Sequence, residues 1–182
     1  MHIKNLEIFT YIDNFDKKNI KKLDKKIHII LRNYKNRFSD QALLDLRIFC
    51  KKNNRKIYLS NDLNRAKNLG FDGAYIPSFN KLLKRHDIGI KKKFIILGSA
   101  HNIQDLIIKK KQKVNFIFLS PLFKNPKNKK YLGINKFNLM ANHNKKIIAL
   151  GGINENNIKN LKILNIKGYA TINYFKQKYE LE

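Results

Sequence analysis

The stretch Ile147–Asn154 reads IIALGGIN, four apolar residues that run directly into two glycines. Such a run is typical of a strand that is buried on both faces of a parallel sheet. Asn154 is an expected helix N-cap, and Ile158, Leu161 and Leu164 continue with helical spacing. The stretch therefore predicts a buried strand, a turn that glycine permits, and a following helix.

The two glycines allow two interpretations. Without side chains at Gly151 and Gly152, their N–H groups could approach a ligand near the positive end of the following helix. Phosphate commonly binds in such a place. An ordinary strand-to-helix turn would use the same residues. Both interpretations stay open on this stretch alone.

The same switch between strand and helix patterns recurs along the whole chain. The expected strands are Leu6–Ile12, Ile27–Leu31, Lys56–Leu59, Asp72–Ile76, Phe94–Leu97, Val114–Leu119, Lys146–Leu150 and Gly168–Ile172. Helices are expected between them, over Phe15–Lys25, after the cap Ser39, over Asn61–Leu69, Ser78–Arg85 and His101–Lys110, through Phe137 and Met140, and after strands seven and eight. Eight units spaced by about 20 residues predict a (β/α)8 TIM barrel rather than a doubly wound open sheet. Residues 1–182 are expected to form one compact α/β domain.

Composition excludes several classes of protein. With 43% hydrophobic and 11% aromatic residues in 182, the chain is expected to fold around a real core. Its apolar runs are strand-sized, and its first residues lack the pattern of a signal peptide, so no membrane association is expected. The single cysteine, Cys50, suits a reducing cytoplasm. We therefore expect a cytoplasmic protein.

The net charge of +26 raises the question of nucleic-acid binding. The lysines are spread along the entire chain, and lysine, asparagine and isoleucine are abundant together, as in an AT-rich coding sequence. A diffuse excess of this kind favours codon bias over a dedicated binding face. We expect no specific nucleic-acid partner, although weak, salt-sensitive attraction to polyanions follows from the charge.

Polar and small residues follow the expected strands. In a (β/α)8 barrel the active site lies at the carboxyl ends of the strands, with phosphate often held after strands seven and eight. The candidates at these ends are Arg32, Lys35, Asn61, Asp62, Ser78, Ser99, His101, Ser120, Gly151, Gly152 and Thr171–Asn173. Cations, a carboxylate, an imidazole and hydroxyls together suit a phosphorylated small molecule.

Three of these residues have simpler interpretations. His101 is either a proton-transfer group or a surface residue at a helix start. Asp62 is either a ligand-binding carboxylate or a first-turn acid favoured by the helix dipole. Arg32 could bind an anion or pair with Asp40 on the surface.

Several motifs in their observed order resemble the thiamine phosphate synthase/TenI family. The resemblance extends over nearly the whole chain from Ile27. The strongest segments are LGSAHN (Leu97–Asn102), FLSPLF (Phe118–Phe123) and IIALGGINENNI (Ile147–Ile158), supported by LSNDLNRAKNLGFDGAYI (Leu59–Ile76) and LRNYKNRFSD (Leu31–Asp40). The resemblance implies the same barrel that the periodicity predicts.

The resemblance also implies a role in thiamine biosynthesis. Synthases of this family join hydroxymethylpyrimidine pyrophosphate to thiazole phosphate and release pyrophosphate with the help of Mg²⁺. TenI relatives catalyse a proton shift that aromatises the thiazole phosphate. The implied partners are therefore these two phosphorylated substrates, and a homo-oligomer is possible.

The implied roles fall on named positions of this chain. The catalytic positions are His101, the acid/base of TenI-type tautomerases, and Lys35. The implied substrate-binding positions are Arg32, Asn61, Asp62 and Ser99 for the pyrophosphate, Ser120 and Lys127 in the loop after strand six, and Gly151, Gly152, Ile172 and Asn173 for the thiazole phosphate. Asp62 is also the implied Mg²⁺ ligand.

The chain departs from the family pattern at several of these positions. Ile30 stands where the family has Gln, and Lys35 lies one residue further along than the pattern asks. Asn80 stands where a second metal-binding Asp is expected, which removes one charge from the Mg²⁺ site. Three functions remain open: a divergent synthase, a metal-free TenI-like tautomerase or regulator, and a non-catalytic barrel that binds a phosphorylated ligand.

Overall fold

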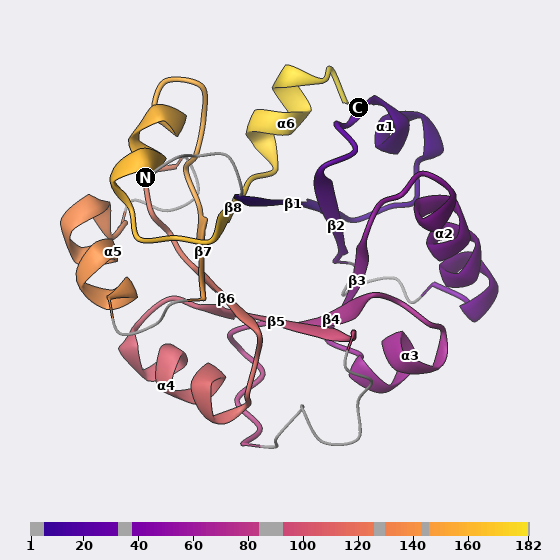
Figure 1. Cartoon of the computed structure of the whole chain (residues 1–182), viewed down its shortest axis with the longest axis horizontal. Coiled ribbons are helices and arrows are strands. Elements are labelled where there is room, and N and C mark those ends of the chain that lie inside the picture. The colour runs from indigo at the N-terminus through magenta and orange to yellow at the C-terminus, as the bar shows by residue number, and fades with distance from the viewer. Residues whose placement is uncertain (1–5, 33–37, 84–92, 126–129, 143–145, 182) are drawn as a thin grey trace.

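Eight parallel strands close into a barrel in which neighbours in the sequence are neighbours in the sheet. The computed structural model describes residues 6–32, 38–83, 93–125, 130–142 and 146–181. The strands are β1 (Glu7–Ile12), β2 (Ile27–Leu31), β3 (Ile57–Ser60), β4 (Gly73–Ile76), β5 (Ile95–Ala100), β6 (Phe116–Leu119), β7 (Ile147–Leu150) and β8 (Gly168–Ala170). The (β/α)8 architecture expected from the periodicity is confirmed (Figure 1).

Helices surround this ring of strands (Figure 1). They are α1 (Lys17–Lys22), α2 (Asp40–Lys52), α3 (Leu63–Asn68), α4 (Ile103–Lys111), α5 (Gly133–Ala141), the 3₁₀ helix η2 (Ile158–Ile163) and α6 (Asn173–Lys178). The expected cap Ser39 is confirmed, since its hydroxyl accepts a hydrogen bond from the Ala42 N–H at 3.2 Å. Among the described residues, no helix combines the length and the apolar character needed to cross a membrane.

The barrel closes where β1 pairs with β8. Glu7 lies opposite Gly168, and the Glu7 N–H donates to the Lys167 carbonyl at 2.9 Å. A Cβ on Gly168 would lie 2.0 Å from the Glu7 carbonyl oxygen. Only glycine allows the two strands to approach this closely, so residue 168 is a requirement of closure.

Every strand contributes to the packed interior of the barrel. Its buried side chains are Phe9, Tyr11, Ile30, Tyr58, Tyr75, Leu97, Phe118, Ile148 and Ala170. Aromatic rings dominate where barrels more often carry branched aliphatic residues. The rings meet edge to face, with centroids 5.1 Å apart for Phe9 and Phe118 and 5.5 Å apart for Tyr75 and Phe118. The barrel is therefore filled below its mouth.

The last helix packs against the first helical segment. Phe175 of α6 joins Leu23 and Ile27 in one buried cluster, and the Lys22 ammonium donates to the Glu180 carbonyl at 3.0 Å. The C-terminal helix thus packs against the end of α1 and the start of β2, which adds helix packing to the β1–β8 hydrogen bonds.

Two expected helices are wrong. Ser78–Leu83, the described part of the helix expected over Ser78–Arg85, forms a turn and irregular chain. The segment after β7 is a 3₁₀ helix, and Asn154 does not cap it. Asn154 instead forms a local turn, accepting from the N–H groups of Asn156 at 3.0 Å and Asn157 at 3.2 Å. Asparagine makes such turns as readily as it caps helices, and sequence alone does not separate the two.

The ends of two strands, β5 and β8, also differ from expectation. The fifth strand extends to Ala100 rather than ending at Leu97, so Ser99 belongs to β5 and not to the following loop. The eighth strand is shorter than expected and ends at Ala170. Both differences move candidate residues relative to the barrel mouth.

A buried arginine joins the α1–β2 segment to the start of β3. Arg55 is 4% exposed and donates to four backbone carbonyls, those of Ile20, Leu23, Asp24 and Ile27, at 2.7 to 3.3 Å. Burial lowers the pKa of its guanidinium. These carbonyls lie in and beyond the end of α1, so Arg55 acts as a remote C-terminal cap.

We expect Arg55→Met to lower the free energy of unfolding by about 3 kcal/mol, because it strands several buried carbonyls at once. Urea denaturation measures the change. Arg47→Met is the matched control, since Arg47 donates to a single exposed carbonyl, that of Gly70. Equal losses in the two variants would contradict a special role for Arg55.

Cys50 is fully buried on α2, and burial raises the pKa of its thiol to about 12. We expect the folded protein to be inert to a thiol reagent at pH 8 and at pH 10, because neither access nor thiolate is available. Stoichiometric labelling in 6–8 M urea, roughly the range that unfolds most domains, is the positive control. Rapid labelling of folded protein would show that α2 opens easily.

Candidate active site at the barrel mouth

Two serines point into the barrel at its carboxyl-terminal end. Side chains alternate along a strand, and Leu97 and Phe118 face the interior, so Ser99 and Ser120 two residues later do the same. They are 4% and 5% exposed. The Ser99 hydroxyl makes no hydrogen bond to any residue that the structure describes. Ser99 therefore presents its hydroxyl at the mouth, and a ligand role for it stays a prediction.

His101 lies beside Ser120. Its Nδ1 is 3.0 Å from the Ser120 hydroxyl and 3.1 Å from the Ser120 carbonyl oxygen. Its own N–H donates to the Asp105 carboxylate at 3.0 Å, which fixes the backbone at the start of α4. A carbonyl oxygen can only accept, so the ring orientation is compatible with a proton on Nδ1 and an accepting Nε2. The sequence prediction that places His101 and Ser120 at one mouth is consistent with this contact.

Sequence reasoning missed a tyrosine pair below the mouth. The Tyr11 and Tyr75 hydroxyls are 3.2 Å apart, and their rings meet edge to face at 5.5 Å. Arg32 lies over the Tyr11 ring, with its guanidinium carbon 5.1 Å from the ring centroid. The available signal was position: both tyrosines stand near the carboxyl ends of strands, where the barrel opens.

Arg32 does not pair with Asp40. Its Nε lies 3.5 Å from Asp13, a loose and exposed contact, while Asp40 pairs with Arg65. A contact of this kind contributes little to stability. Arg32 therefore remains a cation at the mouth, held mainly by its position after β2 and by the Tyr11 ring.

The loops after β3 and β4 meet through asparagines. Asn61 adopts a left-handed backbone conformation, with φ of 59°, and its side-chain oxygen accepts from the Asn80 amide at 3.0 Å. Asp62 is the N-cap of α3, where its carboxylate accepts from the Arg65 N–H at 3.1 Å. Asp62 therefore lies at the cap just before the helix rather than in its first turn, where the simpler interpretation places it, and a ligand role for it stays a prediction.

These residues do not form a Mg²⁺ site by themselves. Among the described residues, no three His, Cys, Asp or Glu side chains lie close enough together to hold a metal ion. The Asp62 carboxylate caps α3, and Asn80 uses its amide to bind Asn61. Mg²⁺ prefers carboxylate and phosphate oxygens. The donor set of the described residues does not fit a resident ion.

The Gly151–Gly152 turn packs under the loop after β6. Their φ angles are 94° and 72°, and a Cβ on Gly152 would lie 2.4 Å from the Phe123 carbonyl oxygen. The Phe123 N–H donates to the Gly151 carbonyl at 3.0 Å. Chain packing therefore requires both glycines whether or not a ligand binds, which gives the simpler of the two sequence interpretations a physical basis.

The same turn also presents N–H groups next to the loop after β8. None of the described residues accepts a hydrogen bond from the N–H of Gly152 or Ile153. The Thr171 hydroxyl donates to the Ile153 carbonyl at 3.3 Å, which holds the two loops together. Ile172 packs against the barrel interior, and Asn173 begins α6. Geometry is thus compatible with an anion at this edge, and the phosphate role stays a prediction.

Two predicted site residues, Lys35 and Lys127, lie outside the described residues. The mouth as described therefore contains Arg32, Asn61, Asp62, Ser99, His101 and Ser120 around one side, and Gly151, Gly152, Ile172 and Asn173 on the other. Closure of the barrel brings these residues from the ends of six different strands to one rim.

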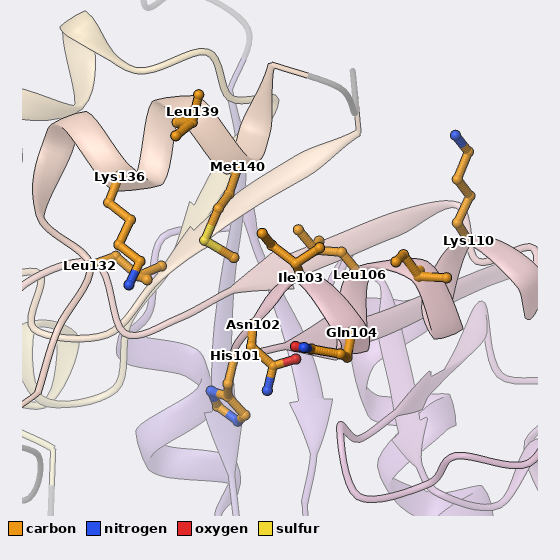
Figure 2. Close-up of a pocket in the computed structure, with 11 residues that line it drawn as sticks. His101, Asn102, Ile103, Gln104, Leu106, Lys110, Leu132, Lys136, Leu139 and Met140 are labelled. Carbon is orange, nitrogen blue, oxygen red and sulfur yellow. The ribbon is translucent and has the colours of Figure 1, made fainter.

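A separate groove lies on the outer wall between α4 and α5. Its volume is about 490 Å³, and Figure 2 shows Leu132 and Met140 of the α5 side facing Ile103 and Leu106 of α4. His101 lies at one end of this groove (Figure 2). The groove is mostly apolar and stands outside the barrel, so we do not assign the mouth chemistry to it.

Comparison with known proteins agrees with the geometry. The family described as thiamine monophosphate synthase matches residues 14–175. No curated protein matches the sequence significantly. Among solved structures, thiamine phosphate pyrophosphorylase from Pyrococcus furiosus is 16% identical with a TM-score of 0.74, covering 99% of this chain and 96% of its own.

Two further structures have the same fold at similar or lower identity. Thiamine phosphate pyrophosphorylase from Bacteroides thetaiotaomicron is 16% identical with a TM-score of 0.62, covering 92% of this chain and 82% of its own. N-(5'-phosphoribosyl)anthranilate isomerase from Pyrococcus furiosus is 11% identical with a TM-score of 0.60, covering 93% and 88%. Sequence identities this low indicate a shared fold and nothing about function. The match over residues 14–175 goes further, and the chain belongs to the thiamine monophosphate synthase family.

Proposed function

We propose that this protein joins hydroxymethylpyrimidine pyrophosphate to thiazole phosphate and releases pyrophosphate. The observation that carries the proposal is the family match over residues 14–175, which spans every strand end from β2 to β8. In this reaction the thiazole nitrogen attacks the methylene carbon of the pyrimidine. A carbon–nitrogen bond forms as the carbon–oxygen bond to pyrophosphate breaks, and the pyrophosphate leaves with the bonding electrons.

The two edges of the mouth suit the two substrates. Arg32 supplies a fixed cation, and Asn61 and Ser99 supply neutral hydrogen-bonding groups, for the pyrophosphate. The N–H groups of Gly152 and Ile153, which donate to none of the described residues, suit the phosphate of the thiazole. Lys35 and Lys127 remain predicted contributors to the pyrophosphate edge. The protein's part is to align the substrates and to stabilise the leaving anion.

A second function, the TenI-like proton shift on thiazole phosphate, has its own support. His101 contacts Ser120 through Nδ1, which leaves Nε2 as the group that would remove a proton from the ring and return it at another atom. This chemistry needs no metal, and the carboxylate set at the mouth is poor in metal ligands. A barrel that binds phosphorylated ligands without catalysis is the outcome if neither reaction occurs.

Purified protein with both substrates and Mg²⁺ should yield thiamine phosphate, detected by chromatography, and pyrophosphate in equal amount. Removing Mg²⁺ should lower the rate, because Mg²⁺ binds phosphate oxygens and would neutralise charge on the leaving pyrophosphate. No product with the pair, together with conversion of the non-aromatic thiazole phosphate alone, would replace the synthase proposal by the tautomerase. Binding without either conversion would leave the non-catalytic barrel.

His101→Ala should lower tautomerase turnover by about 10²-fold, the usual loss on removing a general acid/base. Ser120→Ala should cause a smaller loss of about tenfold or less, because it removes one of the two Ser120 groups that orient the ring. Circular dichroism checks that both variants fold. Unchanged turnover in His101→Ala would remove the imidazole from the mechanism.

A further inference from the structure

A lysine is buried where α4 packs on the barrel. Lys109 is 0% exposed, and its ammonium donates to the carbonyls of Pro77 at 2.8 Å and Asn80 at 2.9 Å. The third donor reaches the side-chain oxygen of Gln112 at 2.9 Å. All three N–H bonds of the ammonium are thus used. Two of them bind carbonyls of the segment after β4, and the third binds Gln112.

Gln112, three residues after Lys109, binds the same segment. It is also 0% exposed, and its amide nitrogen donates to the carbonyls of Asn80 at 3.1 Å and Leu82 at 2.8 Å. The segment Pro77–Leu82 has no helix or strand ladder of its own. Lys109 and Gln112 therefore satisfy the Asn80 and Leu82 carbonyls and add a second donor to the Pro77 carbonyl, which also accepts from the Asn80 N–H. These bonds define the path of the segment.

The barrel wall makes room for this lysine. A Cβ on Gly98 of β5 would lie 2.9 Å from Lys109 Cδ, so the lysine stem occupies the space that a side chain at position 98 would need. Burial lowers the pKa of Lys109 to about 8, which shows that placing the ammonium here is unfavourable in itself. An aliphatic residue would pack on the barrel at less cost.

Lys109 and Gln112 together form a clamp, and the residue that this clamp holds is Asn80. The Asn80 backbone carbonyl accepts from both Lys109 and Gln112, and its side-chain amide donates to Asn61 at 3.0 Å. Asn61 in turn donates its N–H to the Tyr75 carbonyl at 2.7 Å. A continuous chain of hydrogen bonds therefore leads from α4, through the loop after β4, to the loop after β3 at the mouth.

We propose that Lys109 and Gln112 are positioning residues that hold Asn80 against Asn61, and so shape the edge of the mouth that receives the pyrophosphate. The second half of this inference rests on the proposed function; the first half does not. Asn80 donates a side-chain hydrogen bond to Asn61, which an ionised aspartate at position 80 could not do.

Two readouts test the proposal. Hydrogen exchange of the Ser78–Leu82 amides measures how firmly the clamp holds this segment. KM for hydroxymethylpyrimidine pyrophosphate measures how well the mouth binds this substrate. Lys109→Met should speed exchange of these amides by at least about tenfold, since they lose their anchor. It should also raise KM by about tenfold, with kcat changed much less, because it disturbs binding and not the reacting atoms. Lys111→Met, an exposed lysine of the same helix, should change neither.

Asn80→Ala separates positioning from general stability. It removes the link to Asn61 without touching the buried lysine, and it should raise KM as Lys109→Met does. The double variant should be no worse than either single variant, because both break one chain of contacts. Gln112→Leu replaces Lys109→Met if that variant fails to fold, with the same expected direction in both readouts.

The outcomes are distinct. Unchanged exchange in Lys109→Met would overturn the clamp, whatever the activity. Faster exchange with unchanged KM, or additive effects in the double variant, would overturn its role at the mouth. A wild-type protein without synthase activity would instead overturn the proposed function, and exchange of the Ser78–Leu82 amides would still decide whether Lys109 and Gln112 hold the loop.

Discussion

The close approach of β1 and β8 at Gly168 is the constraint on which the rest of the structure depends. Because Gly168 has no side chain, the Glu7 carbonyl can lie where a Cβ would otherwise be, and the two strands can pair there. Closure turns eight short parallel strands into a ring with no free edge. It also directs every carboxyl end to one mouth. Groups as distant in sequence as Arg32 and Ile172 become neighbours on a single rim for this reason.

Aromatic rings fill the barrel below its mouth. Tyr11 and Tyr75 form the uppermost contacts of the aromatic interior, and Arg32 lies over the first of them. A ligand therefore meets a floor of tyrosine rings and the two inward serines rather than an open channel. Small polar substrates that carry their own anionic groups suit such a floor, because the rim supplies the hydrogen-bonding partners.

The two edges of the mouth are held by different physical means. At β7 and β8, glycines let the loop after β6 lie directly on the turn, and Thr171 connects the neighbouring loops. At β3 and β4, Lys109 and Gln112 hold the loop after β4 from the outside of the barrel. The first edge depends on missing side chains and the second on buried polar ones. Helix α4 also anchors the His101 backbone through Asp105, so one helix serves both His101 and Asn80.

The strand positions could be predicted because buried parallel strands are short apolar runs, and this pattern is local to the sequence. The rim residues followed from the barrel, since the end of each strand has a known place in it. Ser78–Leu83 was expected to be helical from its composition, but tertiary hydrogen bonds to Lys109 and Gln112 hold it in an irregular path. Local propensity is weak enough for such contacts to override it.

The sequence by itself determined the order of strands, the closed architecture and the family, because these depend on periodicity and on short motifs. Asp105, Lys109 and Gln112 were visible as polar residues on one helix face, yet their partners lie in other segments of the chain. Only the tertiary structure decided that Lys109 grips the loop after β4, that Asp40 pairs with Arg65, and that Gly152 is required by the Phe123 backbone. Each of these depends on contacts between residues distant in sequence, which local patterns do not encode.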